Sequence, residues 1–459
     1  MTTAHQQGEY LSARNPIATE TQRSVEAQAL EIMELPAMVR ARERATDRLL
    51  LLCRDSGIPT EVAHRLDITM LEWAFHYVLM ALNSDANNPK IVRNYWEPEH
   101  EWFGLSVPGN RTFGGENWDN TYTVLPVDQY GTFELRGQRM DPPVADVSFS
   151  IMANIGVALT LDSIALQELD VAENGSFVIT ISPEPAKRVN GRRNNHLQTK
   201  LGACYLLIRD TRSDWRQVPN AYTIERLSKP LAPPLTIEQM IDYAVQWTVE
   251  DVASNHWFMV TPTTPPANVM PKPFNTGAIG GLVSQGIIQA HFKIADDEAY
   301  VITLPSGGSK VQVLTLYDYW MCAMDWRPTT SLNTSQSAPN PDGTYTYVLS
   351  HTDPGIHNWI DTTGVHDPRI MNRWHAMPVV PGSDSSLWVR GELVKLRDLE
   401  KALPPGTPEI TPRGRSQQLE PHRAQRGSFI AIAVVISAPQ SQDHDSCRRR
   451  TSPPSNTTC

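Results

Sequence analysis

The side chains that could do chemistry are concentrated between residues 351 and 375. That segment contains the ionisable residues His351, Asp353, His357, Asp361, His366, Asp367, Arg369, Arg373 and His375. An imidazole titrates near neutral pH and a neighbouring carboxylate can fix its tautomer, so the segment is suited to general acid–base catalysis. We predict that His351 or His357 acts as the base, with Asp361 as a catalytic carboxylate. Arg373 would then stabilise developing negative charge.

Aromatic residues near this segment predict a small-molecule pocket, because such pockets are lined by aromatic side chains with a few convergent polar groups. The residues expected to bind a substrate are Trp320, Trp326, Asn358, Trp359, His366 and Trp374. Structural roles compete with this interpretation, since aromatic residues also pack β-sandwich cores. Two functions stay open. One is an enzyme for metal-independent hydrolysis, isomerisation or elimination, and the other is a non-catalytic protein that binds a small molecule or a carbohydrate.

No metal and no cofactor are predicted. His351 and His357 are six residues apart, and no third ligand stands at a recognisable spacing. The five cysteines are scattered and odd in number, which indicates buried thiols and no disulfide framework. No phosphate-binding glycine loop, nucleophile elbow or zinc-binding helix motif occurs.

The charge of the chain argues against nucleic acid and anionic membranes as partners, since its formal net charge is −10. The polar N-terminus resembles no secretory signal, so a cytoplasmic location is expected. The longest apolar run, residues 429–436, is shorter than the roughly 20 residues that span a bilayer. A small-molecule ligand is therefore the expected partner, and a homo-oligomer stays open.

Five regions are predicted from the change of hydrophobic period along the chain. Residues 1–105 show helical spacing, and residues 106–230 alternate like the strands of a first β-sandwich unit. Residues 231–270 form a linker that contains a helix capped by Thr236. A second β-sandwich unit covers residues 271–403, and residues 404–459 have the composition of a poorly ordered tail.

The two β units carry similar signals in the same order, which indicates an internal duplication. Tyr122 is expected to correspond to Tyr300, and Gly175 to Gly343. The run from Asn195 to Thr199, with Arg209 downstream, corresponds to the run from Asn358 to Thr362 with Arg373 downstream. A register shifted by one residue from this alignment places Leu197 at the position of Trp359 and Thr199 at that of Asp361. The first copy lacks His351, His357 and His366, which favours a functional role for the second.

A family resemblance supports this interpretation. Residues 318–326, 331–336, 342–343 and 351–362 form an aromatic-rich strand, an Asp-Gly hairpin and an Asp-Pro-Gly turn with Asn358-Trp359-Ile360. Together with residues 115–122, where Trp118 replaces a usual proline, they resemble the bacterial domain-of-unknown-function family twelve-fourteen with its usual N-terminal companion domain. The resemblance covers about residues 100–380. It implies a mainly β fold of two jelly-roll-like antiparallel β-sandwich units after a helical region, and no established activity.

Overall fold

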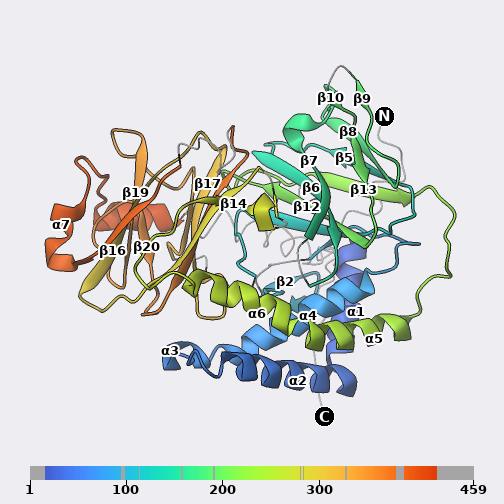
Figure 1. The fold of residues 1–459 in the computed structure, drawn as a ribbon, viewed down its shortest axis with the longest axis horizontal. Helices are drawn as coiled ribbons and strands as arrows, with labels where there is room; N and C mark the ends of the chain where they lie inside the picture. The colour runs from blue at the N-terminus through green and yellow to red at the C-terminus, as the bar shows by residue number, and fades with distance from the viewer. Residues whose placement is uncertain are drawn as a thin grey trace, which may run out of the picture.

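The computed structural model describes residues 16–94, 99–112, 114–156, 159–189, 192–279, 281–282, 284–325, 328–378 and 387–420. The chain is mainly β, with two β units side by side and helices gathered along one side of both (Figure 1). This confirms the predicted mainly β class and the helical N-terminal region. Within the described residues, no helix has the length and apolar character needed to cross a membrane.

The N-terminal region folds into four helices, α1 (Glu20–Met33), α2 (Pro36–Cys53), α3 (Thr60–Ala63) and α4 (Leu66–Leu82). Thr19 caps α1 by accepting a hydrogen bond from the Gln22 amide at 3.1 Å. Pro36 starts α2, because proline lacks the N–H that a helix interior requires. The helix α4 is buried from Trp73 to Leu82, and it is therefore the central helix of this region.

The first β unit consists of two sheets that share one core. Its five-stranded sheet has the order β1-β4-β12-β6-β7, and its four-stranded sheet has the order β11-β8-β5-β13. Phe133 and Leu135 from one sheet meet Phe149 and Ile151 from the other, so the two sheets pack face to face. The strands are β1 (Val92–Arg93), β4 (Asn120–Pro126), β5 (Phe133–Gln138), β6 (Asp146–Ala153), β7 (Leu159–Ala165), β8 (Ser176–Ser182), β11 (His196–Gln198), β12 (Ala203–Thr211) and β13 (Ala221–Arg226).

The second β unit also consists of two sheets around one core. The orders are β14-β15-β21-β17-β18 and β20-β19-β16-β22. Leu314 of the first sheet and Ile302 and Leu349 of the second belong to that core. The strands are β14 (Phe274–Asn275), β15 (Gly286–His291), β16 (Glu298–Pro305), β17 (Val311–Tyr317), β18 (Ser331–Asn333), β19 (Thr344–Ser350), β20 (Trp359–Asp361), β21 (Arg369–His375) and β22 (Arg390–Lys395).

The two units place their main strands in the same order when each is read along the chain, starting from β4 and from β15. In the five-stranded sheet of the first unit, β12 lies between β4 and β6, and in that of the second unit, β21 lies between β15 and β17. One edge pair in each four-stranded sheet is parallel, β8 with β11 and β19 with β20. A jelly roll is wholly antiparallel, and the sheets therefore differ from that expectation at this edge.

The register of the strands corrects part of the predicted correspondence. Gly175 and Gly343 both have positive φ and precede the equivalent strands β8 and β19. The pairing of Tyr122 with Tyr300 is wrong, because Tyr122 lies in the first main strand of its unit and Tyr300 in the second. Similar strings of residues can occur on non-equivalent strands, since any half-buried strand alternates in the same way.

The register also changes the expected counterpart of Trp359. Trp359 pairs with Val348 of β19, and His196 pairs with Thr180 at the same place of β8. The counterpart of Trp359 is therefore His196 and not Leu197, and that of Asp361 is Gln198 and not Thr199.

The helical segment between the β units belongs to the helical layer. Thr236 caps α5 (Ile237–Glu250) in a capping box with Gln239, and α6 (Val252–Val260) follows directly. The helix α5 packs on α4 and α2. The Trp73 indole donates to the Thr248 carbonyl at 2.8 Å, which joins α4 to α5. The segment is thus more than a linker between two units.

Residues 404–420, named here the C-terminal strap, are ordered against the second β unit. The strap follows the short helix α7 (Leu399–Ala402). The His357 amide donates to the Pro408 carbonyl and the Ile410 amide to the Gly355 carbonyl, both at 2.8 Å. Residues 412–420 are helical. The expected loss of structure from residue 404 is therefore corrected up to residue 420, and the remainder of the predicted tail lies outside the described residues.

Candidate functional site

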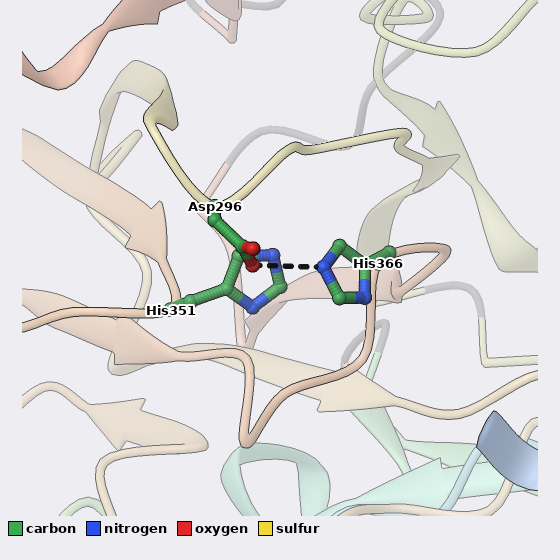
Figure 2. A group of neighbouring side chains, drawn as sticks. All are labelled: Asp296, His351 and His366. Carbon is green, nitrogen blue, oxygen red and sulfur yellow. Dashed lines mark hydrogen bonds and ion pairs between the residues drawn. The ribbon is translucent and has the colours of Figure 1, made fainter.

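Two of the predicted site residues meet on the surface of the second β unit. His351 follows β19 and His366 precedes β21, and their ring centroids are 4.4 Å apart. Asp296, from the loop between β15 and β16, lies beside both rings (Figure 2). The ring of His366 lies between two carboxylates, with Nε2 3.0 Å from Asp296 Oδ1 and Nδ1 2.9 Å from Glu61 Oε2. We name Glu61, Asp296, His351 and His366 the histidine cluster.

The electrostatics of the cluster favour a charged imidazole on His366. The hydrogen bond to Glu61, and then that to Asp296, raises the pKa of His366 above its usual value. His351 is more enclosed, since Nδ1 lies 2.6 Å from the Thr362 hydroxyl and Nε2 lies 3.0 Å from the Ile294 carbonyl oxygen. The cluster can therefore hold and move protons, and it presents nitrogen and oxygen atoms of the kind that bind metal ions.

His357 and Asn358 have a different surrounding, the C-terminal strap. Asn358 is 1% exposed and its amide donates to the carbonyls of Ala338 and Thr346. His357 Nδ1 lies 3.1 Å from Asn358 Oδ1, and the His357 carbonyl accepts from Arg415. Among the described contacts of His357, none reaches the histidine cluster. Its predicted role as a base beside His351 is therefore not supported by this geometry.

Trp359 and Asp361 lie at the edge strand β20. The Arg415 guanidinium stacks 5.3 Å from the centroid of the Trp359 ring, and the Trp359 indole donates to the Ser350 carbonyl. Asp361 accepts from the Thr363 amide at 2.8 Å, and burial raises its pKa. Both residues are half-buried, and their contacts hold the strand, the following turn and the strap together.

Of the remaining predicted tryptophans, the two that the structure describes, Trp320 and Trp374, do not line a binding cleft. Trp320 and Trp374 are both 0% exposed, and their indoles donate to the carbonyls of Val62 and Pro305. They are core residues, because an indole fully packed in a core cannot touch a ligand. Trp326 lies outside the described residues. Trp320 and Trp374 therefore pack in the core and do not line the aromatic cleft that was expected in the second unit.

Arg373 points away from the histidine cluster, toward the first β unit. It lies in β21 opposite Ile287 and Val313. Its guanidinium donates to the Tyr317 hydroxyl at 2.7 Å and to the Gly115 carbonyl, and it is 5% exposed. Both acceptors are uncharged, so these contacts leave the charge of this buried cation uncompensated.

Arg209 lies in the first unit on the middle strand of the five-stranded sheet, as Arg373 does in the second unit. It is in β12, opposite Tyr122 and Ser148, and donates to the Ser150 hydroxyl at 3.3 Å. The guanidiniums of Arg373 and Arg209 both act on the pKa of the buried Tyr122 hydroxyl, which they lower against the larger effect of burial. The charges of the two arginines therefore act on the same buried hydroxyl.

The same two charges act on His375. Burial, followed by the charges of Arg373 and Arg209, lowers its pKa to about 3. Its imidazole is therefore neutral at physiological pH. The ring contacts the side-chain amides of Asn117 and Gln285, each at 3.3 Å. We name Tyr122, Arg209, Tyr317, Arg373 and His375 the interface cluster.

Sequence reasoning did not predict several of these residues. Glu61 and Asp296 are far from residues 351–375 in the chain, and only the fold brings them to His366. Arg209 is the sequence counterpart of Arg373, and that correspondence was the available signal for it. The contribution of Tyr122 depends on strand register, which no local pattern indicates.

A further pocket lies on the first β unit. Its volume is about 740 Å³, and it is lined by the start of α1, residues 88–91 and three residues of β13, including Tyr222. Nearby, Tyr222 and Asn220 donate to the buried Asp210 carboxyl, and burial raises the pKa of Asp210 to about 7. No predicted site residue lines this pocket.

Comparison with known proteins finds a solved structure that shares the fold of this chain. No family model matches the chain, and no curated protein matches it. The crystal structure of an uncharacterised protein from Burkholderia cenocepacia is similar with a TM-score of 0.65 at 22% identity, over 80% of this chain and 99% of that one. The two proteins share a fold. The VPA0106 protein from Vibrio parahaemolyticus has a TM-score of 0.40 at 13% identity, over 61% of this chain and 90% of that one.

Proposed function

We propose that the protein binds a small organic anion between its two β units and performs acid–base chemistry on it. This proposal is supported by the charges of Arg209 and Arg373, which come from the middle strands of the two five-stranded sheets and act on the same buried Tyr122 and His375. Two guanidiniums that act on the same groups repel each other, and a carboxylate between them would relieve that repulsion. Arg209 is half-buried, so it is the member of the pair that solvent can reach.

His375 is the proposed base of this site, although burial, the largest cause of its pKa of about 3, makes the imidazole a weak base before a ligand binds. Its neutral imidazole has a lone pair at physiological pH. A bound anion would reduce the effect of Arg373 and Arg209 on this imidazole and raise its proton affinity. Arg373 would stabilise the negative charge that develops on the ligand, the role expected for it from the sequence. The tyrosines and Met371, which contacts the Gly115 region, supply an apolar wall.

A duplication would explain why each unit has an arginine on the middle strand of its five-stranded sheet. We propose that both β units derive from one jelly-roll-like ancestor with a parallel edge pair. Arg209 and Arg373 would then be the same ancestral position on the middle strands of the two five-stranded sheets. We also keep the resemblance to domain-of-unknown-function family twelve-fourteen as a proposal, in which Gly115, at the start of the segment 115–122, accepts from Arg373.

The test compares the wild-type chain with Arg209→Met and Arg373→Met in a mixture of small mono- and dicarboxylic acids and in a metabolite extract. Mass spectrometry then measures which compounds disappear and which are enriched on the protein. Consumption supports the enzyme, and enrichment without consumption supports the alternative of a binding protein. Arg136→Met is the matched control, because the Arg136 side chain in β5 is 60% exposed.

Arg209→Met and Arg373→Met should neither consume nor enrich the anion, and Arg136→Met should behave like the wild type. Arg209→Met is decisive, since its half-buried side chain can be removed with less risk to the fold than that of Arg373. A wild-type chain that neither consumes nor enriches any anion would contradict the proposal. So would a folded Arg209→Met variant that behaves like the wild type.

A further inference from the structure

The histidine cluster is separate from the interface cluster and has the composition of a metal site. One ligand-type atom from each of Asp296, His351 and His366 lies within 4.8 Å of the others. The three residues come from three loops of the second β unit, and in Figure 2 each imidazole turns a nitrogen toward the Asp296 carboxylate. A single ion could contact all three side chains after small adjustments.

The outer nitrogen of each imidazole already has an oxygen partner. His366 Nδ1 lies 2.9 Å from Glu61 Oε2, and His351 Nδ1 lies 2.6 Å from Thr362 Oγ1. Histidines that bind metals usually donate their other ring N–H to such an oxygen, which fixes the tautomer and the orientation of the ring. The arrangement therefore leaves Nε2 of both rings as the atoms that can face an ion.

The inner nitrogens lie near oxygen atoms. His366 Nε2 is 3.0 Å from Asp296 Oδ1, and His351 Nε2 is 3.0 Å from the Ile294 carbonyl oxygen. When these nitrogens carry protons, they donate to those oxygens. A divalent cation would replace the protons and would bring the same nitrogen and carboxylate atoms into its coordination.

We propose that the histidine cluster binds one divalent first-row transition ion of the zinc type. The ligands would be Nε2 of His351, Nε2 of His366 and the carboxylate of Asp296. Two imidazoles and one carboxylate suit such an ion better than Mg²⁺ or Ca²⁺, which prefer oxygen ligands alone. Three protein ligands also leave a position open for water or a substrate.

Glu61 gives the site a second property. This carboxylate belongs to α3 of the N-terminal region, and it accepts from the His366 backbone amide at 2.7 Å as well as from the ring. Binding of the ion therefore depends on the contact between the N-terminal helices and the second β unit. The proposal departs from the sequence-based expectation of no metal, because Asp296 is not recognisable there as the third ligand.

The test is calorimetric titration of Zn²⁺ into the metal-stripped full chain, compared with His351→Ala, His366→Ala and Asp296→Asn. The wild type should bind one ion that each of these variants binds at least about ten-fold more weakly. Asp296→Asn carries the least risk to the fold, because the Asp296 side chain is 88% exposed. Glu61→Gln should weaken binding about ten-fold by loosening His366.

His357→Ala is the matched control, since this histidine lies six residues from His351 and outside the cluster. It should bind Zn²⁺ like the wild type, and so should Arg209→Met, which separates this proposal from the anion site. Circular dichroism checks that each variant is folded. A wild type that binds no Zn²⁺ would overturn the proposal, and so would a folded Asp296→Asn and His366→Ala pair with unchanged affinity.

Discussion

At the scale of single residues, Glu116 is an ionisable side chain that is buried in the core. Glu116 is 0% exposed, and burial raises its pKa to about 8, although the nearby Arg111 acts in the opposite direction. One of its carboxyl oxygens accepts from the Ala323 amide at 2.7 Å, and the other has no hydrogen-bond partner among the described residues. Glu116 is therefore protonated in the folded chain at neutral pH.

This protonation predicts a pH dependence of stability. The pKa of Glu116 is higher in the folded chain than in the unfolded one. The contribution of Glu116 to the free energy of unfolding is therefore fully present below about pH 4.5 and is lost as the pH rises toward about 8. Glu116→Gln is neutral throughout and should gain stability relative to the wild type over that range. The relative gain should be on the order of 3 kcal/mol.

Urea unfolding at pH 5, 6, 7 and 8, followed by circular dichroism, measures this gain. Glu225→Gln, at an exposed position of β13, serves as the control and should give no comparable trend. Curves for Glu116→Gln and the wild type that stay parallel from pH 5 to pH 8 would show that Glu116 is not protonated in the fold.

At the scale of elements, the C-terminal strap packs against the turn of residues 353–357 in the second unit. Arg415 is 5% exposed and forms a two-pronged ion pair with Asp353, at 2.9 and 3.1 Å. It also donates to the carbonyls of Ile356 and His357. One side chain thus satisfies three groups of the turn from residue 353 to residue 357, which explains why that turn and the strap are ordered together.

Arg415→Met should therefore detach the strap. We expect a loss of about 2 kcal/mol in the free energy of unfolding, since the Asp353 side chain is one-third exposed and can be resolvated. Limited proteolysis should cut the variant within residues 404–420 earlier than the wild type. Arg413→Met, at an exposed position two residues away, is the control. Equal cleavage of both variants would exclude this role of Arg415.

At the scale of the whole molecule, the segment before β4 joins the two β units. The Gly115 amide donates to the Met321 carbonyl, and the Gly115 carbonyl accepts from Arg373. Gly115 has φ +75°, and a Cβ there would lie 2.9 Å from Met371 Cε. The backbone conformation at this position therefore requires glycine, whereas an added Cβ would displace only the ends of the Met371 and Met321 side chains.

Gly115→Ala should destabilise the chain more than Gly57→Ala. Gly57 has a similar φ of +70°, but a Cβ at this position would meet no atom within 4 Å, so its substitution costs only the backbone strain of about 1 kcal/mol. At Gly115 the displacement of the buried Met371 side chain should add about 1 kcal/mol, the low end of overpacking, because Cε is the end of a flexible side chain. Thermal unfolding of the two variants measures the difference. An equal loss would show that the interface can relax around the added methyl group.

Local patterns in the sequence determined the elements and their class. Hydrophobic spacing of three and four predicts helices wherever one face is buried, and the N-terminal helices follow it, except for the break at Pro36. Thr236 with Gln239 marks the start of α5. Short runs of β-branched and aromatic residues likewise predict β4, β5, β6 and β8. The burial of β5 and β8 alternates as expected for a strand with one buried face, whereas β4 and β6 are buried at every position.

Tertiary structure alone decided which side chains meet. Nearness within residues 351–375 suggests one site, but β21 is a strand, and successive side chains along a strand point to opposite faces of its sheet. Within β21, Arg373 therefore reaches Tyr317 and Gly115 while Trp374 enters the core. His366 precedes the strand, and its loop brings it to Asp296 and Glu61. Contacts between distant segments depend on strand register and sheet packing, and neither is encoded in the spacing of one segment.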